Sequence, residues 1–474
     1  METLIGREFE KKELEKCMSS GKKELIAIYG RRRVGKTFLI RSFFKDKFDF
    51  YTTGIIEGSF NDEIRAFSES LTEYGYKGER PTNWEAAFSA LATLLHKKTR
   101  SVTRPLTVFI DELPCFDTRN SKFVRAFDHF WNSKGSWFEN IKFFICGSAT
   151  SWMIKNVINN KGGLHNRVTH EIHLKPFNLY QTELYFKHHK FQYSQLSILQ
   201  IYMAIGGIPY YLDLLDKDLT VYDNIDKLFF GDDAALGKEY PRLFNSLYKS
   251  PEGYKNIINV LAKSKKGMTR LEISKKLQTP NNGHLGEMLD NLIYCDFIRQ
   301  YNNGTKTNGG IYQITDFYLL FYFQFCTKRH TDIHFWRNMT GTSVINNWYG
   351  LAFERVCMYH IREIIQALRF DSIHTEYYSW RSKEADSSAQ IDIIIDRADN
   401  NISVCEVKYS QTSYLLTKNE YQKILNRVET FRRETKTRKG LQTTLITTFG
   451  LKENEYAHIS FRTVVLKDLF CKAE

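Results

Sequence analysis

A glycine-rich segment near the N-terminus constrains this 474-residue chain more than any other feature. Residues 24–29 are an apolar run typical of a strand, residues 30–37 read Gly-Arg-Arg-Arg-Val-Gly-Lys-Thr, and residues 38–44 fit the start of a helix. This is a G-x-x-x-x-G-K-[ST] motif between a strand and a helix. Its glycines allow the backbone to wrap phosphates, and the helix N-terminus directs N–H groups at them. The segment predicts a P-loop on the parallel sheet of an α/β protein.

The expected nucleotide contacts follow from phosphate and metal chemistry. Lys36 would neutralise the β- and γ-phosphates, and the Thr37 hydroxyl would be a ligand of Mg²⁺. ATP and Mg²⁺ are therefore the expected cofactors. The residues predicted to surround the phosphates are Gly30, Arg31, Arg32, Arg33, Val34, Gly35, Lys36, Thr37 and Phe38.

Two further apolar runs end in polar residues suited to the same site. Residues 106–112 end in Asp111 and Glu112, which could hold Mg²⁺ and polarise the attacking water; alternatively, the two acids merely close a strand at a polar loop. Residues 141–146 lead into Gly-Ser-Ala-Thr. There Ser148 or Thr150 would lie at the ligand-binding edge of the sheet and sense the γ-phosphate, or would cap the next helix.

Taken together, these motifs resemble the archaeal-type P-loop ATPases of the STAND branch of the AAA+ superclass. The match also includes residues 5–8, 147–148, 174–177 and 206–209. The resemblance implies that Gly6 and Arg7 belong to the base-binding edge and that Pro209 packs near the purine. The family's L-Y-G-R run reads Leu-His-Asn-Arg at residues 164–167 here. It makes Arg167 a candidate arginine sensor or finger, with an ordinary surface arginine as the alternative.

The middle of the chain reads as two smaller modules. Aromatic and aliphatic residues at helical spacing through residue 230 predict a helical lid. Three helix-like and two strand-like segments within 251–314 match a winged helix-turn-helix. Its basic residues suit DNA phosphates, although packing between domains is the alternative. These residues are Lys263, Lys265, Lys266, Arg270, Lys275 and Lys276.

The last third contains a second group of charged residues. Residues 389–395 and 403–408 read as strands, and Glu406 and Lys408, two residues apart, share a face of the second. If the strands are adjacent, Asp392 joins them. Carboxylates on otherwise apolar strands are costly unless they bind something, and a divalent metal held by Asp392 and Glu406 would compensate their charge. Lys408 would orient water, and Glu354, on a predicted helix, could complete the acidic cluster.

This D-x13-E-x-K pattern resembles the PD-(D/E)XK nuclease superfamily, and the chain as a whole is similar to archaeal and bacterial ATPases with a C-terminal DUF234 domain. A buried structural salt bridge is the alternative for the acidic residues. The expected domains are a P-loop ATPase core (1–177), a helical lid (178–245), a winged helix (246–316), a helical linker (317–345) and a restriction-endonuclease-like α/β domain (346–474). Residues that could follow a phosphate backbone, or form only a solvated loop, are Arg432, Arg433, Lys436, Arg438 and Lys439.

Composition limits the remaining possibilities. A net charge of +13 permits a nucleic-acid partner but does not identify one. The eight cysteines show no C-x2-C spacing, and no apolar run is long enough for a membrane span. We expect a soluble cytoplasmic protein that binds ATP and DNA and forms a nucleotide-dependent homo-oligomer. The predicted function is an ATP-hydrolysing switch acting on DNA with a Mg²⁺-dependent nuclease-like domain; the alternative is a non-nucleolytic regulatory ATPase whose C-terminal domain only binds nucleic acid or protein.

Overall fold

The computed structural model describes residues 3–472 except residues 161, 165, 249, 265, 302–309, 329 and 383–388. For residue 136 it describes only the backbone. The chain divides into two compact units, which are described separately below. The first contains Met1–Pro176 with the short segments Ser246–Lys249 and Tyr294–Asp296; the second contains Phe177–Asn245, Ser250–Ile293 and Phe297–Glu474. No helix of the described residues is long and apolar enough to cross a membrane.

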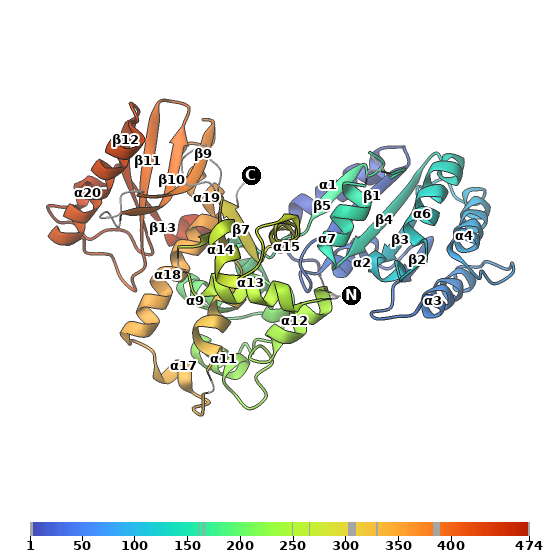
Figure 1. Cartoon of the computed structure of the whole chain (residues 1–474), viewed down its shortest axis with the longest axis horizontal. Helices are drawn as coiled ribbons and strands as arrows, with labels where there is room; N and C mark the ends of the chain where they lie inside the picture. Colours follow the sequence, from blue (N-terminus) through green and yellow to red (C-terminus); the bar gives the residue numbers. More distant parts are fainter. Residues whose placement is uncertain are drawn as a thin grey trace. The chain divides into compact units, whose positions relative to one another are not determined.

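A five-stranded parallel sheet forms the centre of the first unit (Figure 1). Its strand order is β2-β3-β4-β1-β5, so the strand before the P-loop is internal. The three strands predicted here are present, and the α/β class is confirmed; β2 and β5 were not predicted. The bounds are β1 Glu24–Tyr29, β2 Phe50–Thr53, β3 Leu106–Asp111, β4 Ile141–Gly147 and β5 His170–His173.

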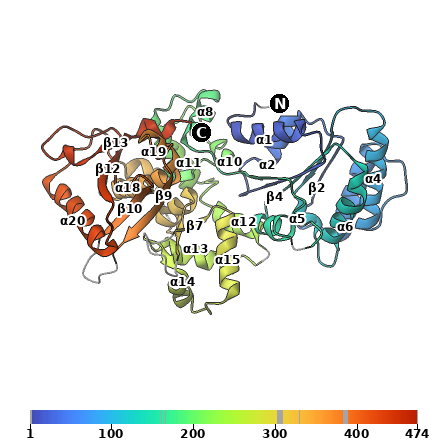
Figure 2. The ribbon, with the colours of Figure 1, turned by 90° about the horizontal axis from the view of Figure 1, so that it is seen from above.

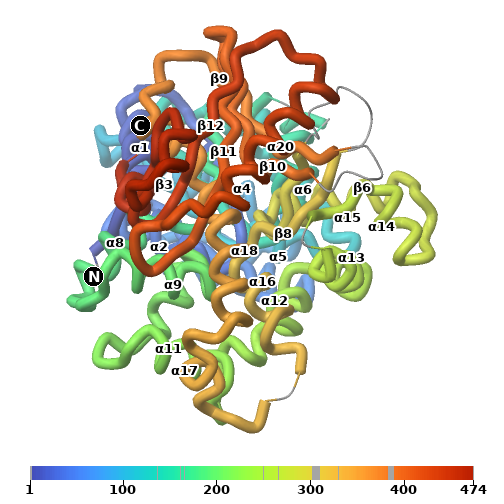
Figure 3. The backbone as a smooth tube through the Cα atoms, turned by 90° about the vertical axis from the view of Figure 1, so that its left-hand side faces the viewer, coloured from blue at the N-terminus to red at the C-terminus, as the bar shows by residue number. Residues whose placement is uncertain are grey.

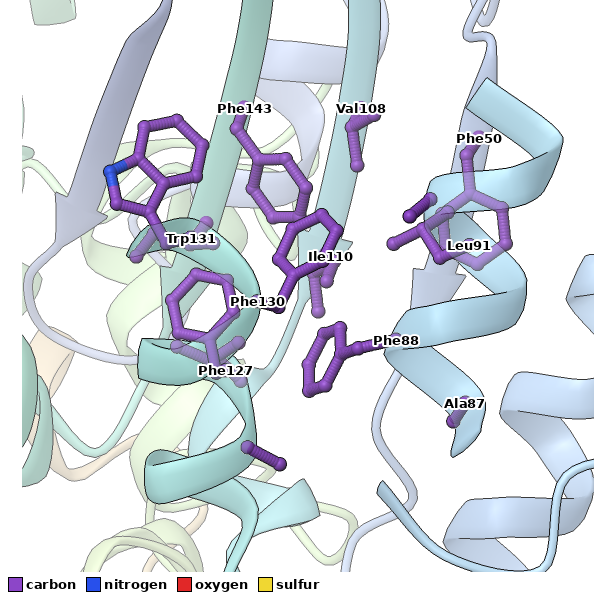
Figure 4. Packing of buried hydrophobic residues seen from close by; sticks show 14 of the residues in the cluster. Phe50, Ala87, Phe88, Leu91, Val108, Ile110, Phe127, Phe130, Trp131 and Phe143 are labelled. Atoms are coloured by element: carbon purple, nitrogen blue, oxygen red, sulfur yellow. The ribbon is translucent and has the colours of Figure 1, made fainter. Parts of the chain in front are cut away.

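Side-chain alternation along β4 divides the packing between the two faces of this sheet. Phe143 packs against Phe130 and Phe127, in the aromatic core under helices α4 (Trp84–Thr99) and α6 (Phe123–His129) (Figure 4). Phe144 points to the opposite face and packs on Phe44 of α2 (Lys36–Phe44), with ring centroids 4.9 Å apart. Apolar helices on both faces leave the ends of the strands as the place for polar side chains.

The second unit includes a small module of three helices and three short antiparallel strands. Its elements are α13 Glu252–Ala262, β6 Met268–Thr269, α14 Arg270–Leu277, α15 Gly283–Tyr294, β7 Ile298–Tyr301 and β8 Ile311–Ile314, with sheet order β6-β8-β7. The predicted helices and hairpin are therefore present, with β6 in addition. Lys265, one of the predicted basic residues, lies outside the described residues.

A second five-stranded sheet, of mixed direction, forms the C-terminal part of this unit. Its order is β13-β12-β11-β10-β9, antiparallel from β9 to β11 and parallel from β11 to β13. One face packs on Phe431 and Val428 of α20, and α18 contacts β11 (Figure 2). The bounds are α18 Ser343–Tyr359, β9 Thr375–Arg381, β10 Gln390–Arg397, β11 Asn401–Lys408, α20 Lys418–Thr435, β12 Gly440–Thr447 and β13 Arg462–Val465.

Helices of the predicted lid pack directly on the C-terminal helices. Helix α9 (Gln195–Ile205) contacts both α16 (Phe317–Phe321) and α18 (Figure 3). His360 is fully buried, accepts a hydrogen bond from the Leu179 N–H at 2.9 Å, and lies 2.8 Å from the Val356 carbonyl. This histidine joins the start of α8 (Leu179–His188) to the end of α18.

The remaining α-helices of the described residues complete the packing of the two units. They are α1 Glu8–Ser19, α3 Phe60–Glu73, α5 Leu113–Phe116, α7 Thr150–Met153, α10 Pro209–Leu212, α11 Val221–Phe229, α12 Glu239–Leu247, α17 Phe335–Asn338 and α19 Ile361–Ala367.

The buried histidine predicts a pH-dependent stability. Burial lowers the pKa of His360 from 6.5 to about 4, so between these values the unfolded chain takes up the proton more readily. The free energy of unfolding should therefore fall as pH drops from 6.5 towards 4, by up to roughly 3 kcal/mol from this group. Urea midpoints measured from pH 7 to pH 5 should shift less in His360→Ala than in the wild type.

The exposed His458 supplies the control for this measurement. His458→Ala should keep the wild-type pH dependence. An unchanged slope in His360→Ala would contradict the assignment.

Candidate functional site

The P-loop is folded closely around its lysine. Lys36 is 5 % exposed, and its Nζ donates to the carbonyl oxygens of Gly30 and Arg31, each at 3.0 Å. Gly30 has φ 141°, and a Cβ there would lie 2.3 Å from the Leu174 carbonyl oxygen. Only glycine fits this approach. Burial lowers the pKa of Lys36, and nearby acidic groups including Glu112 and Asp111 oppose the shift.

Two oxygen donors suited to Mg²⁺ lie in contact beside the lysine. The Thr37 hydroxyl donates to Asp111 Oδ2 at 2.7 Å, and Asp111 is 3 % exposed. The Asp111 carboxylate also accepts bonds from the Glu112 N–H at 2.9 Å and from the Cys146 thiol. Burial, with a smaller contribution from Glu112, raises the pKa of Asp111. Hydroxyl and carboxylate oxygens are ligands that Mg²⁺ prefers, so the residues present fit this ion.

Glu112 is held by the end of strand β4. Ser148 Oγ donates to Glu112 Oε1 at 2.6 Å, and the Ser148 N–H donates to Oε2 at 3.0 Å. Glu112 itself has φ 46°, in the left-handed region. Thr150 is buried and begins α7, whose N-terminus has no side-chain cap. In this structure Ser148 therefore fixes the direction of the Glu112 carboxylate and caps no helix.

Arg7 connects the P-loop to the segment after β5. Its guanidinium is 3 % exposed and donates to the Val34 carbonyl at 3.1 Å and to the Lys175 carbonyl at 2.8 Å. The expected position of Arg7 at the base-binding edge stays a prediction, but its hydrogen bonds to Val34 and Lys175 give it a second role that the sequence did not suggest. It braces the phosphate-binding backbone from outside.

The other predicted nucleotide contacts differ in exposure. Arg31 is 1 % exposed, whereas Phe38 is 39 % exposed. Arg167 is exposed in a turn closed by its N–H on the Leu164 carbonyl at 3.0 Å. The preceding Asn166 has φ 55°, a conformation asparagine tolerates, so it can replace the family's glycine there. Gly6 and Gly35 also have positive φ. Val34 is buried, and Arg32 and Arg33 are half-buried. Pro209 is the first residue of α10 and belongs to the second unit.

In the second unit, strand register brings the predicted acidic residues together. Ile393 pairs with Cys405 at the end of the antiparallel ladder between β10 and β11, so Asp392 and Glu406 are the residues directly beyond the last pair on the two strands. Glu406 lies on the face that packs against α20, where Arg427 donates to Glu406 Oε2 at 2.5 Å. Asp392 Oδ1 accepts a bond from Gln390 at 2.7 Å.

Glu354 of α18 belongs to the same electrostatic environment. Burial raises the pKa of Glu354, and the negative charges of Asp392 and Glu406 raise it further. Glu354 on α18 is thus repelled by carboxylates on β10 and β11, a repulsion that a bound cation would relieve. The sequence predicted this group of residues, and its role as a metal site stays a prediction.

Cations already contact Glu406 in the structure. Lys408 Nζ lies 2.9 Å from Glu406 Oε1 and 3.9 Å from Glu420, opposite the bond from Arg427. Within the described ranges, no three acidic, histidine or cysteine side chains are gathered at metal-binding distance. The carboxylates therefore fit a divalent metal in kind, but they are not gathered around one point here, and Lys408 and Arg427 occupy Glu406. Arg427 and Glu420 were not predicted, because only the fold brings α20 to this strand.

Basic residues are distributed unevenly over the second unit. In the helical module Lys263, Lys266, Lys275 and Lys276 are exposed, but α15 exposes the acidic Glu287 and Asp290. Arg432, Arg433, Lys436 and Arg438 are exposed at the end of α20. Lys439 instead pairs with Asp396 at 2.5 Å. The basic face expected of this module stays a prediction, and its third helix presents negative charge.

Comparison with known proteins assigns the two ends of the chain. Residues 4–215 match the family model described as an ATPase domain predominantly from Archaea. Residues 4–215 are therefore an ATPase domain of this family. Residues 322–424 match a family described as archaeal and bacterial proteins of unknown function. The chain therefore joins a P-loop ATPase domain to a C-terminal DUF234 domain.

Curated relatives resemble the whole chain or the ATPase domain. An uncharacterized protein of Methanocaldococcus jannaschii, MJECL04, is 27 % identical over 426 residues, covering 86 % of this chain and 87 % of the relative. An uncharacterized ATP-binding protein of the same organism, MJ0423, is 46 % identical over 44 residues, which are 9 % of this chain and 75 % of the relative.

Solved structures with weaker similarity include Walker-type ATPases. One of Pyrococcus abyssi has 18 % identity and a TM-score of 0.46, with 68 % of this chain and 96 % of that chain covered. The ORC2 protein of Aeropyrum pernix has 12 % identity and a TM-score of 0.41, with coverages of 66 % and 90 %.

The brace on the P-loop of the ATPase domain can be tested by removing Arg7. Arg7→Ala should weaken ATP binding about 10-fold, because charged hydrogen bonds that hold the loop contribute about 1.5–3 kcal/mol each. Fluorescent-nucleotide titration measures the effect. Lys12→Ala removes an exposed charge from α1, the helix that follows Arg7, and this variant should bind ATP normally. Wild-type affinity in Arg7→Ala would show that the brace is dispensable.

Proposed function

We propose that this chain is an ATP-hydrolysing switch that acts on DNA, with Mg²⁺-dependent nuclease chemistry in its C-terminal domain. The observation that carries the proposal is the convergence of Glu354, Asp392 and Glu406 beside Lys408, in a chain whose ATPase domain retains its P-loop. Carboxylates that repel one another on a packed sheet lower stability, so a role in binding a metal accounts for their presence together.

In the ATPase domain, each predicted site residue would have its own role in ATP hydrolysis. Lys36 would leave the carbonyls of Gly30 and Arg31 to neutralise the β- and γ-phosphates, while Thr37 and Asp111 would hold Mg²⁺. Mg²⁺, when bound, neutralises developing charge on the phosphates. Glu112 would act as the general base after release from Ser148, which makes Ser148 a sensor of the γ-phosphate. Arg167, exposed in the turn before β5, would stabilise transition-state charge in the same or a neighbouring copy.

In the C-terminal domain, chemistry would depend on exchange of partners at Glu406. A metal ion held there supplies Lewis-acid activation of a phosphodiester. Asp392 and Glu406 would be its ligands, and Glu354 would complete the acidic cluster. Lys408, released from Glu406, would orient the attacking water. The order α18-α19-β9-β10-β11-α20-β12, with the acidic residues on α18, β10 and β11, supports the nuclease resemblance.

DNA is the proposed substrate because basic residues are exposed beside both modules. Arg432, Arg433, Lys436 and Arg438 would follow the phosphate backbone at the end of α20. The helical module at residues 246–316 is proposed as a winged helix that contacts phosphates through α14 and its preceding loop. The acidic α15 disfavours base reading by that helix. The domain boundaries, a cytoplasmic location and a nucleotide-dependent homo-oligomer belong to the same proposal.

A non-nucleolytic regulator remains the competing function. In that case the C-terminal domain would only bind nucleic acid or a protein partner, and the ion pairs of Glu406 with Lys408 and Arg427 would be permanent structural contacts. The two functions differ in one readout, which is metal-dependent cleavage.

The ATPase assignment predicts that Lys36→Ala abolishes ATP turnover, since the phosphates lose their fixed cation. Phosphate release with Mg²⁺ measures this. Lys47→Ala, an exposed lysine just beyond α2, should turn over ATP at the wild-type rate. Normal hydrolysis in Lys36→Ala would exclude this site as the hydrolytic centre.

The nuclease assignment predicts that Asp392→Asn or Lys408→Ala abolishes Mg²⁺-dependent cleavage while ATP turnover persists. The matched control is Asp396→Asn on the same strand, because Asp396 pairs with Lys439 away from the cluster. Products are followed on a denaturing gel with duplex DNA and with RNA. If the wild-type protein cuts neither substrate with Mg²⁺ or Mn²⁺, the regulatory alternative is correct.

A further inference from the structure

Strand β7 of the helical module lies beside the acidic cluster of the C-terminal sheet. Both belong to the second unit, and two views place β7 next to the β9–β10 edge (Figures 1 and 2). Arg299, in the middle of β7, interacts electrostatically with Asp392 and Arg355. Arg355 is 8 % exposed and follows Glu354 on α18. A strand more than 90 residues upstream of Asp392 in the chain thus reaches the predicted nuclease site.

Neutral groups hold the Arg299 side chain in place. Its Nε and Nη2 both donate to Gln313 Oε1, at 3.1 and 2.7 Å, and its guanidinium lies 5.2 Å from the Tyr301 ring centre. Tyr301 is fixed in turn by its hydroxyl, which donates to the Lys266 carbonyl at 2.9 Å. Among the described residues, no carboxylate forms an ion pair with Arg299.

The charge on Arg299 is therefore poorly compensated. Burial and the neighbouring Arg355 lower the pKa of Arg299 to about 9, so the guanidinium remains charged at neutral pH at a cost in free energy. Lys408 and Arg427 differ from it, because both already contact Glu406. Of these three cations near the cluster, Arg299 is the one with no acidic partner among the described residues to exchange before it binds an anion.

We propose that Arg299 binds a phosphate of the nucleic-acid strand that enters the C-terminal site, so that the β7–β8 hairpin forms part of that site. This inference rests on the proposed nuclease function and names its substrate contact. A guanidinium suits the task because its planar donors match phosphate oxygens, and Gln313 keeps the group oriented.

A polymer fits the surroundings better than a free phosphate. The exposed Lys266 lies beside Tyr301, and exposed arginines continue at the end of α20, so several cations could contact successive phosphates. Binding of one strand by the hairpin and by the C-terminal sheet would join two modules that the sequence presents as separate. Arg299 would be a binding residue and would take no part in proton transfer.

The test measures DNA affinity of the full-length protein by fluorescence anisotropy, with Ca²⁺ in place of Mg²⁺ so that binding is read without relying on cleavage. Arg299→Ala should weaken duplex binding about 10-fold, the amount expected for loss of one charged hydrogen-bonding group. The slope of log affinity against log salt should fall by about one. Gln313→Glu should also weaken binding, because a carboxylate would neutralise Arg299 within the hairpin, and Arg299→Lys should restore part of the affinity.

Arg337→Ala is the matched control, because Arg337 is a partly exposed arginine of the same unit that pairs with Asp223. It should bind DNA normally, and every variant should keep wild-type ATP turnover, which verifies folding of the ATPase domain. Wild-type DNA affinity in Arg299→Ala would overturn the inference while leaving the proposed function intact. If the wild-type protein binds no nucleic acid, both fail. Equal competition by inorganic phosphate, at the same phosphate concentration as the duplex, would overturn the polymer assignment.

Discussion

The close approach of the P-loop backbone to the segment after β5 is the contact on which the nucleotide site depends. The missing side chain of Gly30 lets this loop lie against the Leu174 carbonyl, and Arg7 ties Val34 to Lys175 from outside. Within this frame Lys36 can be buried, because two loop carbonyls accept hydrogen bonds from its ammonium group. The parallel sheet adds the rest, because β3 and β4 end at the same edge with Asp111, Glu112 and Ser148.

In the first unit the charge of Lys36 is satisfied by loop carbonyls. In the second unit, by contrast, groups of like charge lie near one another. Asp392 and Glu406 repel Glu354, and Arg355 repels Arg299. Packing of α18 and α20 on the sheet stabilises the fold against these costs. A site with such stored repulsion changes its contacts readily when a counter-charge arrives, whereas apolar packing alone would not.

Local sequence patterns were sufficient for the strand and helix on either side of the P-loop and for the two strands that carry Asp392 and Glu406. The strand before Gly30 and the alternation of Glu406 with Lys408 are determined by neighbouring residues, so both could be predicted. Strands β2 and β5 are only four residues long, which is too short for a periodic signal. Arg427, Arg299 and the bracing bonds of Arg7 depend on contacts between residues distant in sequence, which one chain without its fold does not reveal.

The buried contact between His360 and Leu179 has a mechanical consequence. Helix α8 begins just after the first unit ends, and its first amide is bonded to the helix that carries Glu354. Helix α9 adds contacts with α16 and α18 to this link. A displacement that starts at residue 177 would therefore reach the helix that carries Glu354 through hydrogen-bonded and packed residues of a single unit.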